Sequence, residues 1–387
     1  MKKILSTAIL MITVWVSANS QSLNKSTSGI DMNKNYSRAV ALQAIMKKYT
    51  DQGLPGASIA VCTESEGWWA GASGYSNVEA KKPMTVDHIQ YLQSVSKSYM
   101  AVAIMKLHEE KKIDLNAPAS KYLPPNQAKY LKNLDKITIK MLLNHTSGLP
   151  EYSEDAEFIS YVMLHPTQVF DMNKALEWLA NNQPLFAPGA MHKYTNTNFL
   201  LLAMIGDAIT GDHAAYIEKN IFRRLGLKNT FYRSSYNYLH YSNLVDSYWD
   251  VLNTGHPANI SPLQRANVAT LKGDDGIVCT TTDAIQFLKG LVEGKLLNDS
   301  SLSMMKQWVN DSEGHPIYGL GLVFYAEGGL TGFGHSGGGI GAGCVLIYVP
   351  EKKTYVFLAA NIATLFGGEL AKKADDLKNE ALATILF

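Results

Sequence analysis

The chain has 387 residues, of which 46% are hydrophobic and 18% are charged, a balance typical of a globular protein with one large domain or two that share a core. Its formal net charge is +1 at pH 7. A charge this small attracts no polyanion, so we expect no nucleic-acid partner.

The N-terminus has the pattern of an export signal. Met1-Lys2-Lys3 is a short basic start, and residues 4–16 form an apolar segment too short to span a bilayer. Ala18-Asn19-Ser20 then supplies small residues at a cleavage site. We predict a secretory signal peptide over residues 1–20 and therefore a periplasmic or secreted bacterial protein.

Downstream of this signal we predict a flexible polar leader over residues 21–35 and a single domain over residues 36–387. No cysteine stands at the cleavage region to carry a lipid, so no membrane anchor is expected after cleavage. The three cysteines, Cys62, Cys279 and Cys344, lie in or beside apolar runs, where a buried free thiol is the common outcome. An odd set allows at most one disulfide.

The apolar pattern predicts strands towards both ends of the domain and helices between them. The first elements are a helix at 36–49, strands at 57–62 and 68–75, and a buried helix from 99 to 105. Residues 107–271 have the pattern of helices and long loops, including helices at 175–180 and 199–209. The last elements are a helix at 282–294, strands at 318–325, 341–349 and 354–360, and a helix at 370–385. We therefore expect one sheet assembled from both ends of the chain, with a helical lobe inserted and the site in the cleft between them.

A Ser-x-x-Lys pair opens the longest apolar run. Ser94 and Lys97 lie three residues apart and so face the same side of a helix, and residues 99–105 are apolar on every face, which predicts burial. A serine in the first turn lies near free backbone N–H groups and the positive end of the helix dipole. Desolvation would lower the pKa of such a lysine, which could then accept the serine's proton. The alternative is a capping serine beside a solvated lysine, and Ser303 and Lys306 have the same spacing.

A second candidate pair is Tyr194 and Asn196. Residues two apart in an extended segment point the same way, and a phenol beside an ammonium ionises more readily and can relay protons. The alternative is a buried tyrosine and a turn-forming asparagine, and Tyr241 and Asn243 repeat the spelling. We favour Tyr194 because Pro188-Gly189 places it on a loop just before a strongly apolar helix.

The third candidate is a glycine-rich segment, residues 332–343, that contains His335 and Ser336. Glycines let a substrate backbone or a second chain segment lie close to this edge, and free backbone N–H groups can bind an oxyanion. The segment also fits the Gly-x-Ser-x-Gly nucleophile elbow, with Ser336 as the nucleophile. That alternative requires a helix after the serine and a later histidine, whereas glycines and a strand follow and His335 is the last histidine.

Taken in order, Ser94-Val95-Ser96-Lys97, Tyr194-Thr195-Asn196 and His335-Ser336-Gly337 resemble the three motifs of the penicillin-recognising serine hydrolases. They are most similar to the branch of class C β-lactamases, DD-peptidases and related esterases. The likeness covers roughly residues 54–360. It includes the segments 142–150, 225–230 and 276–283.

This resemblance implies an α+β fold of the β-lactamase/transpeptidase type, an α/β sandwich with an antiparallel sheet flanked by helices. It implies an acyl-enzyme on Ser94, with Lys97 and Tyr194 sharing the role of base. Asn196 would hold the substrate amide and help fix Lys97, and the backbone N–H groups of Ser94 and Gly338 would form the oxyanion hole. The strand edge beside the acyl group would be His335, Ser336 and Gly337. We expect no cofactor and no metal.

Two departures from the class C pattern bear on the substrate. His335-Ser336-Gly337 stands where Lys-Thr-Gly is usual, so an imidazole that is largely neutral at pH 7 replaces an ammonium and a substrate carboxylate would bind less well. Gln93 stands where a small residue is common and is expected to narrow the pocket. The expected substrate is a D-amino-acid peptide, as for a DD-carboxypeptidase, a β-lactam or an ester. The alternative is a catalytically idle penicillin or cell-wall-peptide sensor, and a monomer is the simplest expectation.

Overall fold

The computed structural model describes residues 29–233 and 238–387. The predicted signal peptide and residues 21–28 of the predicted leader lie outside these ranges. The described end of the leader lies against the sheet, where Met32 forms a β-bridge with Trp68. Within these ranges, none of the helices has the length and hydropathy needed to cross a bilayer.

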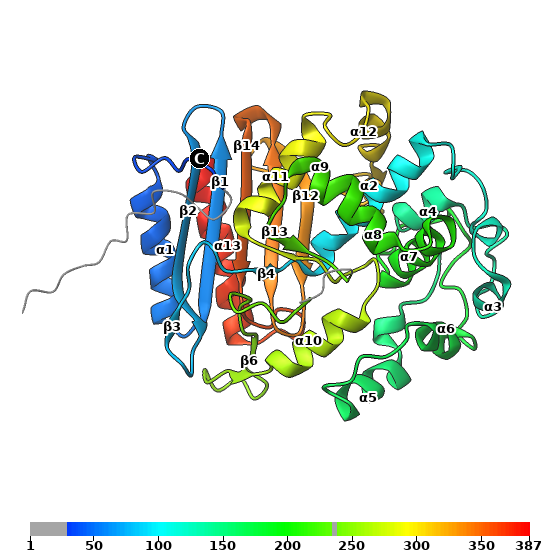
Figure 1. The fold of residues 1–387 in the computed structure, drawn as a ribbon, viewed down its shortest axis with the longest axis horizontal. Coiled ribbons are helices and arrows are strands. Elements are labelled where there is room, and N and C mark those ends of the chain that lie inside the picture. Colours follow the sequence, from blue (N-terminus) through cyan, green and yellow to red (C-terminus); the bar gives the residue numbers. More distant parts are fainter. Residues whose placement is uncertain (1–28, 234–237) are drawn as a thin grey trace, which may run out of the picture.

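A nine-stranded antiparallel sheet forms the centre of the fold (Figure 1). Across the sheet the strands are β3 (Lys82–Pro83), β2 (Gly67–Asn77), β1 (Gly56–Thr63), β14 (Thr354–Ala360), β13 (Gly343–Val349), β12 (Leu330–Gly338), β11 (Val323–Glu327), β10 (Pro316–Tyr318) and β9 (Val309–Asn310). Because β1 pairs with β14, the two ends of the chain build one sheet, and the predicted α+β fold is confirmed.

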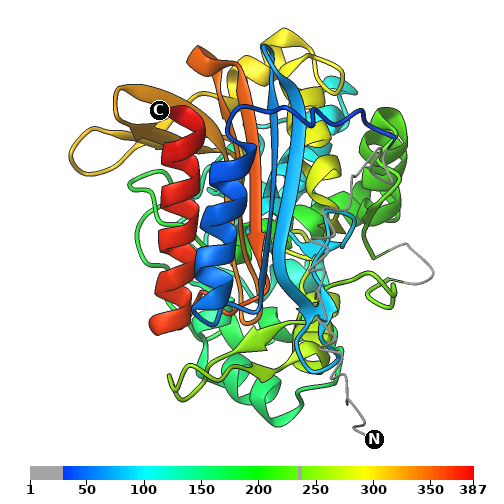
Figure 2. The same cartoon turned by 90° about the vertical axis from the view of Figure 1, so that its left-hand side faces the viewer.

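The central strands of this sheet are buried on both faces, and the strand register decides which residues face which layer. Ile59 and Val345 both pair with Leu358, and all three pack on α1 (Ala39–Asp51) and α13 (Glu369–Leu386). These two helices lie side by side over one face of the sheet (Figure 2).

The opposite face carries the helix of the Ser-x-x-Lys pair. At the next position along the same strands, Ala60 and Leu346 both pair with Phe357. All three belong to the core that contains α2 (Ser96–Glu109). Residues 96–107 of α2 are all buried, so the prediction of a central buried helix is confirmed. The Tyr99 ring stacks on Phe287 of α11 (Thr281–Val292), with ring centroids 3.5 Å apart.

The inserted lobe is mostly helical, as predicted, and lies beside the end of α2 (Figure 1). Its helices are α3 (Pro125–Ala128), α4 (Ile139–Leu143), α5 (Ala156–Leu164), α6 (Asn173–Leu179), α7 (Asn196–Thr210), α8 (His213–Ile217), α9 (Arg223–Leu225) and α10 (Ser261–Thr270). Small sheets join it to the core through β4 (Gln90–Tyr91), β5 (Thr230–Phe231) and β8 (Val278–Cys279), with β6 (Tyr248–Trp249) and β7 (Ala258–Asn259) as a separate pair. A further helix, α12 (Asp299–Met305), precedes β9.

The predicted strand at 318–325 is wrong, because the chain turns within it. It is divided between β10 and β11 by a tight turn in which Gly319 N donates to Leu322 O at 2.7 Å. Gly321 has φ +73°, and a Cβ there would lie 2.3 Å from the Cβ of Ala101 on α2. The turn therefore packs its backbone directly on α2, which only glycine permits.

Candidate active site

Ser94 lies in a turn of 3-10 helix, Gln93–Val95, that leads directly into α2. Gln93 adopts a left-handed conformation with φ +47°, which is uncommon for a residue with a side chain and tends to mark functional sites. Ser94 is partly exposed, whereas Gln93 and the residues from Val95 to Met105 are buried. The turn thus presents one hydroxyl to solvent from an otherwise buried helix.

The glycine-rich strand β12 lies against this turn. A Cβ at Gly337 would lie 2.4 Å from Leu92 O, and a Cβ at Gly339 would lie 2.3 Å from Gln93 Oε1. The prediction that these glycines admit a second chain segment is confirmed. Gln93, which we expected to narrow the pocket, lines the cavity beside Ser94.

Lys97 is fully buried and is held between Ser94 and a loop of the core. Its Nζ donates to Ser94 Oγ at 2.9 Å and to the backbone oxygen of Asp274 at 2.9 Å. Burial opposes its charge, but Tyr194 and the carboxylates of Asp274 and Asp275 outweigh burial, so the pKa of Lys97 is raised. The predicted lowering of this pKa is therefore wrong, because desolvation is not the only influence on the ammonium.

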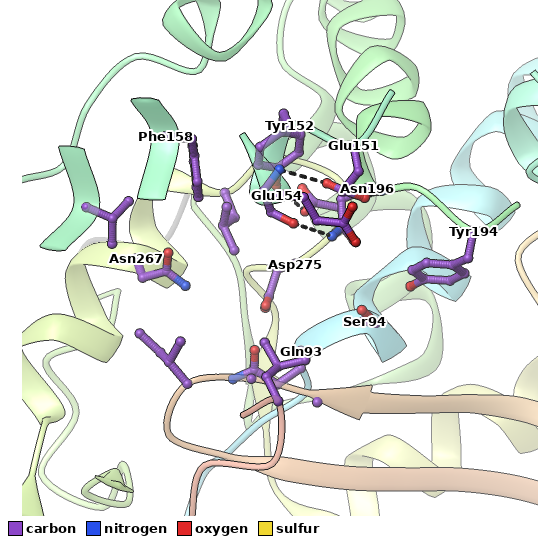
Figure 3. A pocket seen from close by; sticks show the side chains of 18 of the residues that line it. Gln93, Ser94, Glu151, Tyr152, Glu154, Phe158, Tyr194, Asn196, Asn267 and Asp275 are labelled. Carbon is purple, nitrogen blue, oxygen red and sulfur yellow. Dashed lines mark hydrogen bonds between the residues drawn. The ribbon is translucent and has the colours of Figure 1, made fainter. Parts of the chain in front are cut away.

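Tyr194 is delivered by the loop before α7 and points its hydroxyl towards Ser94 (Figure 3). Its ring lies 5.0 Å from Lys97 Nζ and packs on the ring of His145 at 4.3 Å between centroids. Burial raises the pKa of Tyr194 and the nearby Lys97 only partly offsets this. The expected easier ionisation of the phenol is therefore not found in the resting site.

Asn196 lies at the start of α7, where its backbone N donates to Glu151 Oε2 at 2.5 Å and its Nδ2 donates to Ser153 Oγ at 3.3 Å. The side chain lines the cavity, where it can meet a substrate amide. The resemblance implied that Asn196 helps to fix Lys97. In the structure the backbone oxygen of Asp274 accepts from the Lys97 ammonium instead.

His335 is buried in β12 and has both ring nitrogens engaged. Nδ1 lies 2.6 Å from Ser336 O, so it carries the proton, and Nε2 accepts from the Tyr318 hydroxyl at 2.9 Å. Burial and the charge of Lys97 lower the pKa of His335 to about 3. The imidazole is thus a neutral, positioned part of the wall and supplies no positive charge for a carboxylate.

These elements surround one cavity of about 710 Å³ between the sheet and the inserted lobe (Figure 3). Of the predicted site residues, those that line it are Ser94, Tyr194, Asn196, His335, Ser336 and Gly338. Lys97 lies beneath them, and Gly337 lines a second, smaller cavity. The predicted cleft and the two backbone groups proposed for the oxyanion hole therefore meet at one place.

The sequence did not single out the acidic residues of this cavity, Glu151, Glu154, Asp274 and Asp275. The sequence feature that could have indicated two of them is Gly-Asp-Asp-Gly at residues 273–276, directly before an apolar strand. The loop is fixed beside Ser94, because Ile277 accepts from Leu92 N and donates to Ser96 Oγ.

The second Ser-x-x-Lys match and the second Tyr-x-Asn match lie outside the cavity lining. Ser303 belongs to α12, and Tyr241 stacks on Phe231 with centroids 4.0 Å apart. Ser336 is exposed within β12, which continues into β13 instead of a helix, so the geometry of a nucleophile elbow is absent from this described segment.

The three cysteines are free and buried, as expected. One group of potential metal ligands occurs within the described residues: Asp207, Asp212 and His213. Asp207 already contacts His213 Nδ1 at 2.6 Å and Lys272 Nζ at 3.0 Å. This cluster is an ion-pair network, and none of its three potential ligands lines the cavity.

The sheet, the inserted lobe and the Ser-Lys-Tyr cluster together define the class of penicillin-recognising serine hydrolases. The family model for beta-lactamase matches residues 42–380, and the chain belongs to that family. A penicillin-binding protein of Bacillus subtilis (strain 168) is 27% identical over 306 residues, which cover 74% of this chain and 64% of that protein. The chain therefore spans less than two thirds of this curated relative.

Solved structures show the same fold. The D-amino acid amidase from Ochrobactrum anthropi SV3, complexed with L-phenylalanine amide, has a TM-score of 0.76 at 22% identity and covers 89% of this chain and 97% of its own. A D-stereospecific amidohydrolase from Streptomyces sp. has a TM-score of 0.76 at 25% identity and covers 87% of this chain and 97% of its own.

Proposed function

We propose that the protein is an exported serine hydrolase that cleaves an amide or ester through an acyl-enzyme on Ser94. The observation that carries this is the 2.9 Å hydrogen bond from the buried Lys97 ammonium to the one partly exposed hydroxyl of the turn. Export is supported by the basic and apolar pattern of residues 1–20.

The chemical step forms a bond from Ser94 Oγ to the substrate carbonyl carbon and breaks the Oγ–H bond. The ammonium of Lys97 stabilises the alkoxide, and the Lys97–Tyr194 pair takes the proton once it has lost one of its own to solvent. The pair then returns the proton to the leaving group, and water releases the acyl chain. The backbone N–H groups of Ser94 and Gly338 would hold the oxyanion.

Within this reaction class, a D-amino-acid peptide, a β-lactam and an ester remain the candidate substrates. The amidase and amidohydrolase likenesses support the first of these. An idle sensor would acylate once and keep the acyl group, but Ser94, Lys97 and Tyr194 are all in place around the cavity, which supports turnover.

The test is intact-protein mass spectrometry over time after mixing with a fluorescent penicillin, and in parallel with a nitrophenyl ester. We expect an adduct that maps to Ser94 and a catalytic release of nitrophenol. A permanent adduct without turnover would indicate the sensor instead. An adduct on Ser336 would refute the assignment of the nucleophile.

A further inference from the structure

The charges around the cavity are strongly one-sided. Four carboxylates line it, from Glu151, Glu154, Asp274 and Asp275, and no lysine or arginine occurs among its described lining residues. Two of these carboxylates are less suited to bind a ligand. Glu151 already accepts from the backbone N–H groups of Ser153 and Asn196, and Glu154 is exposed at the rim of the cavity.

The other two carboxylates form the floor of the cavity. Asp274 is 2% exposed; its Oδ2 accepts from the Tyr152 hydroxyl at 2.5 Å, while its Oδ1 is buried without a partner. Asp275 is 6% exposed; its Oδ1 accepts from Gly276 N at 2.6 Å, and its carboxyl group points into the cavity (Figure 3). Both therefore retain oxygen lone pairs that no described residue uses.

The one buried cation nearby cannot balance this pair. Lys97 donates to the backbone oxygen of Asp274 and to Ser94, so its hydrogen bonds go to neither aspartate side chain. With both carboxylates charged, the single ammonium leaves this group with a net charge of −1, and burial makes that charge unfavourable. A cation with N–H donors that contacts Asp275 would stabilise the charged forms.

The other half of the cavity is apolar. Side chains of α5 and of the loop 363–368 line it, and several of them are exposed to solvent. The apolar lining comes from Phe158, Ile159, Val162, Met163, Leu365 and Phe366. A ligand that fits both halves has an apolar group on one side and a compact cation on the other.

We propose that the site takes substrates that carry a primary ammonium group beside the scissile carbonyl, as in an N-terminal amino acid amide or ester, and that Asp275 is the specificity residue that binds this ammonium. This inference rests on the proposed serine hydrolase function and names its substrate class. It separates the protein from hydrolases that recognise a substrate carboxylate, since the neutral His335 offers no counter-charge.

Burial and the neighbouring Asp274 raise the pKa of Asp275 to about 7. Burial also raises the pKa of Asp274 to about 6. An ammonium bound between them favours their charged forms and offsets this effect of burial. The groups that face Asp275 are Asp274, the Gly276 N–H and Lys97, and of these only Lys97 is cationic.

The experiment measures how the wild-type chain hydrolyses the p-nitrophenyl esters of three acids: phenylalanine in both enantiomers, N-acetylphenylalanine and 3-phenylpropionate. We expect kcat/KM for one phenylalanine enantiomer to exceed that for both neutral compounds by at least about 30-fold, the effect of a desolvated charge pair. If Ser94-dependent hydrolysis occurs and the neutral esters are equal or better substrates, the inference fails and the proposed function stands. If no ester is cleaved in a Ser94-dependent manner, both fail.

A matched set of variants assigns the role to one residue. Asp275→Asn should reduce the ratio of kcat/KM between the amino ester and the 3-phenylpropionate ester by at least about 30-fold, and Asp275→Glu should recover part of it. Glu157→Gln, an exposed acid on α5 outside the cavity lining, is the control and should leave the ratio as in the wild type. An unchanged ratio in a folded Asp275→Asn protein would overturn the assignment.

Discussion

Replacing Asp275 by Asn should make the protein more stable at alkaline pH. Asn keeps the shape and can still accept from Gly276 N, but it carries no charge next to Asp274. The pKa of Asp275 rises from 3.8 to about 7 on folding, so the folded chain binds this proton more tightly than the unfolded chain. With this sign, the carboxylate lowers the free energy of unfolding as pH rises from about 4 through about 7.

The expected gain in the free energy of unfolding follows from the pKa shift of Asp275. A difference of about three pKa units corresponds to about 4 kcal/mol at pH 8, and to less than about 2 kcal/mol at pH 5, where the folded carboxyl is still protonated. These are upper bounds, because Asp274 and Asp275 titrate as a pair and removing one also relieves the other. We expect the variant to gain about 2 to 4 kcal/mol at pH 8 and clearly less at pH 5.

The assay is urea unfolding of the mature chain at pH 5 and pH 8, followed by tryptophan fluorescence and circular dichroism. Glu157→Gln removes an exposed carboxylate from the same lobe and should not change the stability at either pH. If Asp275→Asn is no more stable than the wild type at pH 8, Asp275 is not an uncompensated buried charge. A substrate ammonium bound at Asp275 would then offset no cost of burial.

Four further predictions address the chemistry and the packing of the site. Ser94→Ala should abolish covalent labelling by a fluorescent penicillin while Ser336→Ala leaves it detectable, and the reverse pattern in a gel assay would restore the elbow alternative. Tyr194→Phe should lower kcat by roughly a hundred- to ten-thousand-fold, the usual share of a proton-transferring group, and an unchanged kcat would remove Tyr194 from the mechanism. Because Lys97 and Tyr194 both have raised pKa values, kcat/KM for a neutral ester should increase with pH above neutrality, and a flat profile there would contradict a doubly protonated resting pair. Tyr318→Phe leaves the buried His335 Nε2 without its donor and should cost about 1 to 3 kcal/mol in urea unfolding.

The parts of the site that were predictable from the sequence are those set by local spacing. Ser94 and Lys97 are one helical turn apart, so their contact follows from helix geometry once the apolar run fixes the helix. The prediction of Tyr194 needed two further observations, the order of the three motifs in the chain and the Pro-Gly loop before this residue. The buried character of α2 followed directly from the absence of any polar face.

The parts that were missed depend on contacts between distant segments. The pKa of Lys97 is raised first by Tyr194 and then by Asp274 and Asp275, all far away in the chain, so no local pattern reports its direction. The strand predicted at 318–325 breaks because Gly321 packs on α2, and apolar periodicity does not record such a contact. Asp275 was overlooked since an acid beside glycine is usually a solvated turn.

The neutral His335 and the acidic floor point to the same chemistry from opposite walls. A carboxylate-bearing substrate, such as a β-lactam or a peptide with a free C-terminus, would meet no cation from β12, because both nitrogens of His335 are engaged. It would also approach the buried Asp275 with a like charge, which is unfavourable. A substrate with an ammonium avoids both difficulties. It needs no cation from β12, and its charge is opposite to that of Asp275. Selectivity would therefore arise as much from rejecting carboxylates as from binding amines, and lowering the pH through about 7 should weaken it as Asp275 takes up a proton.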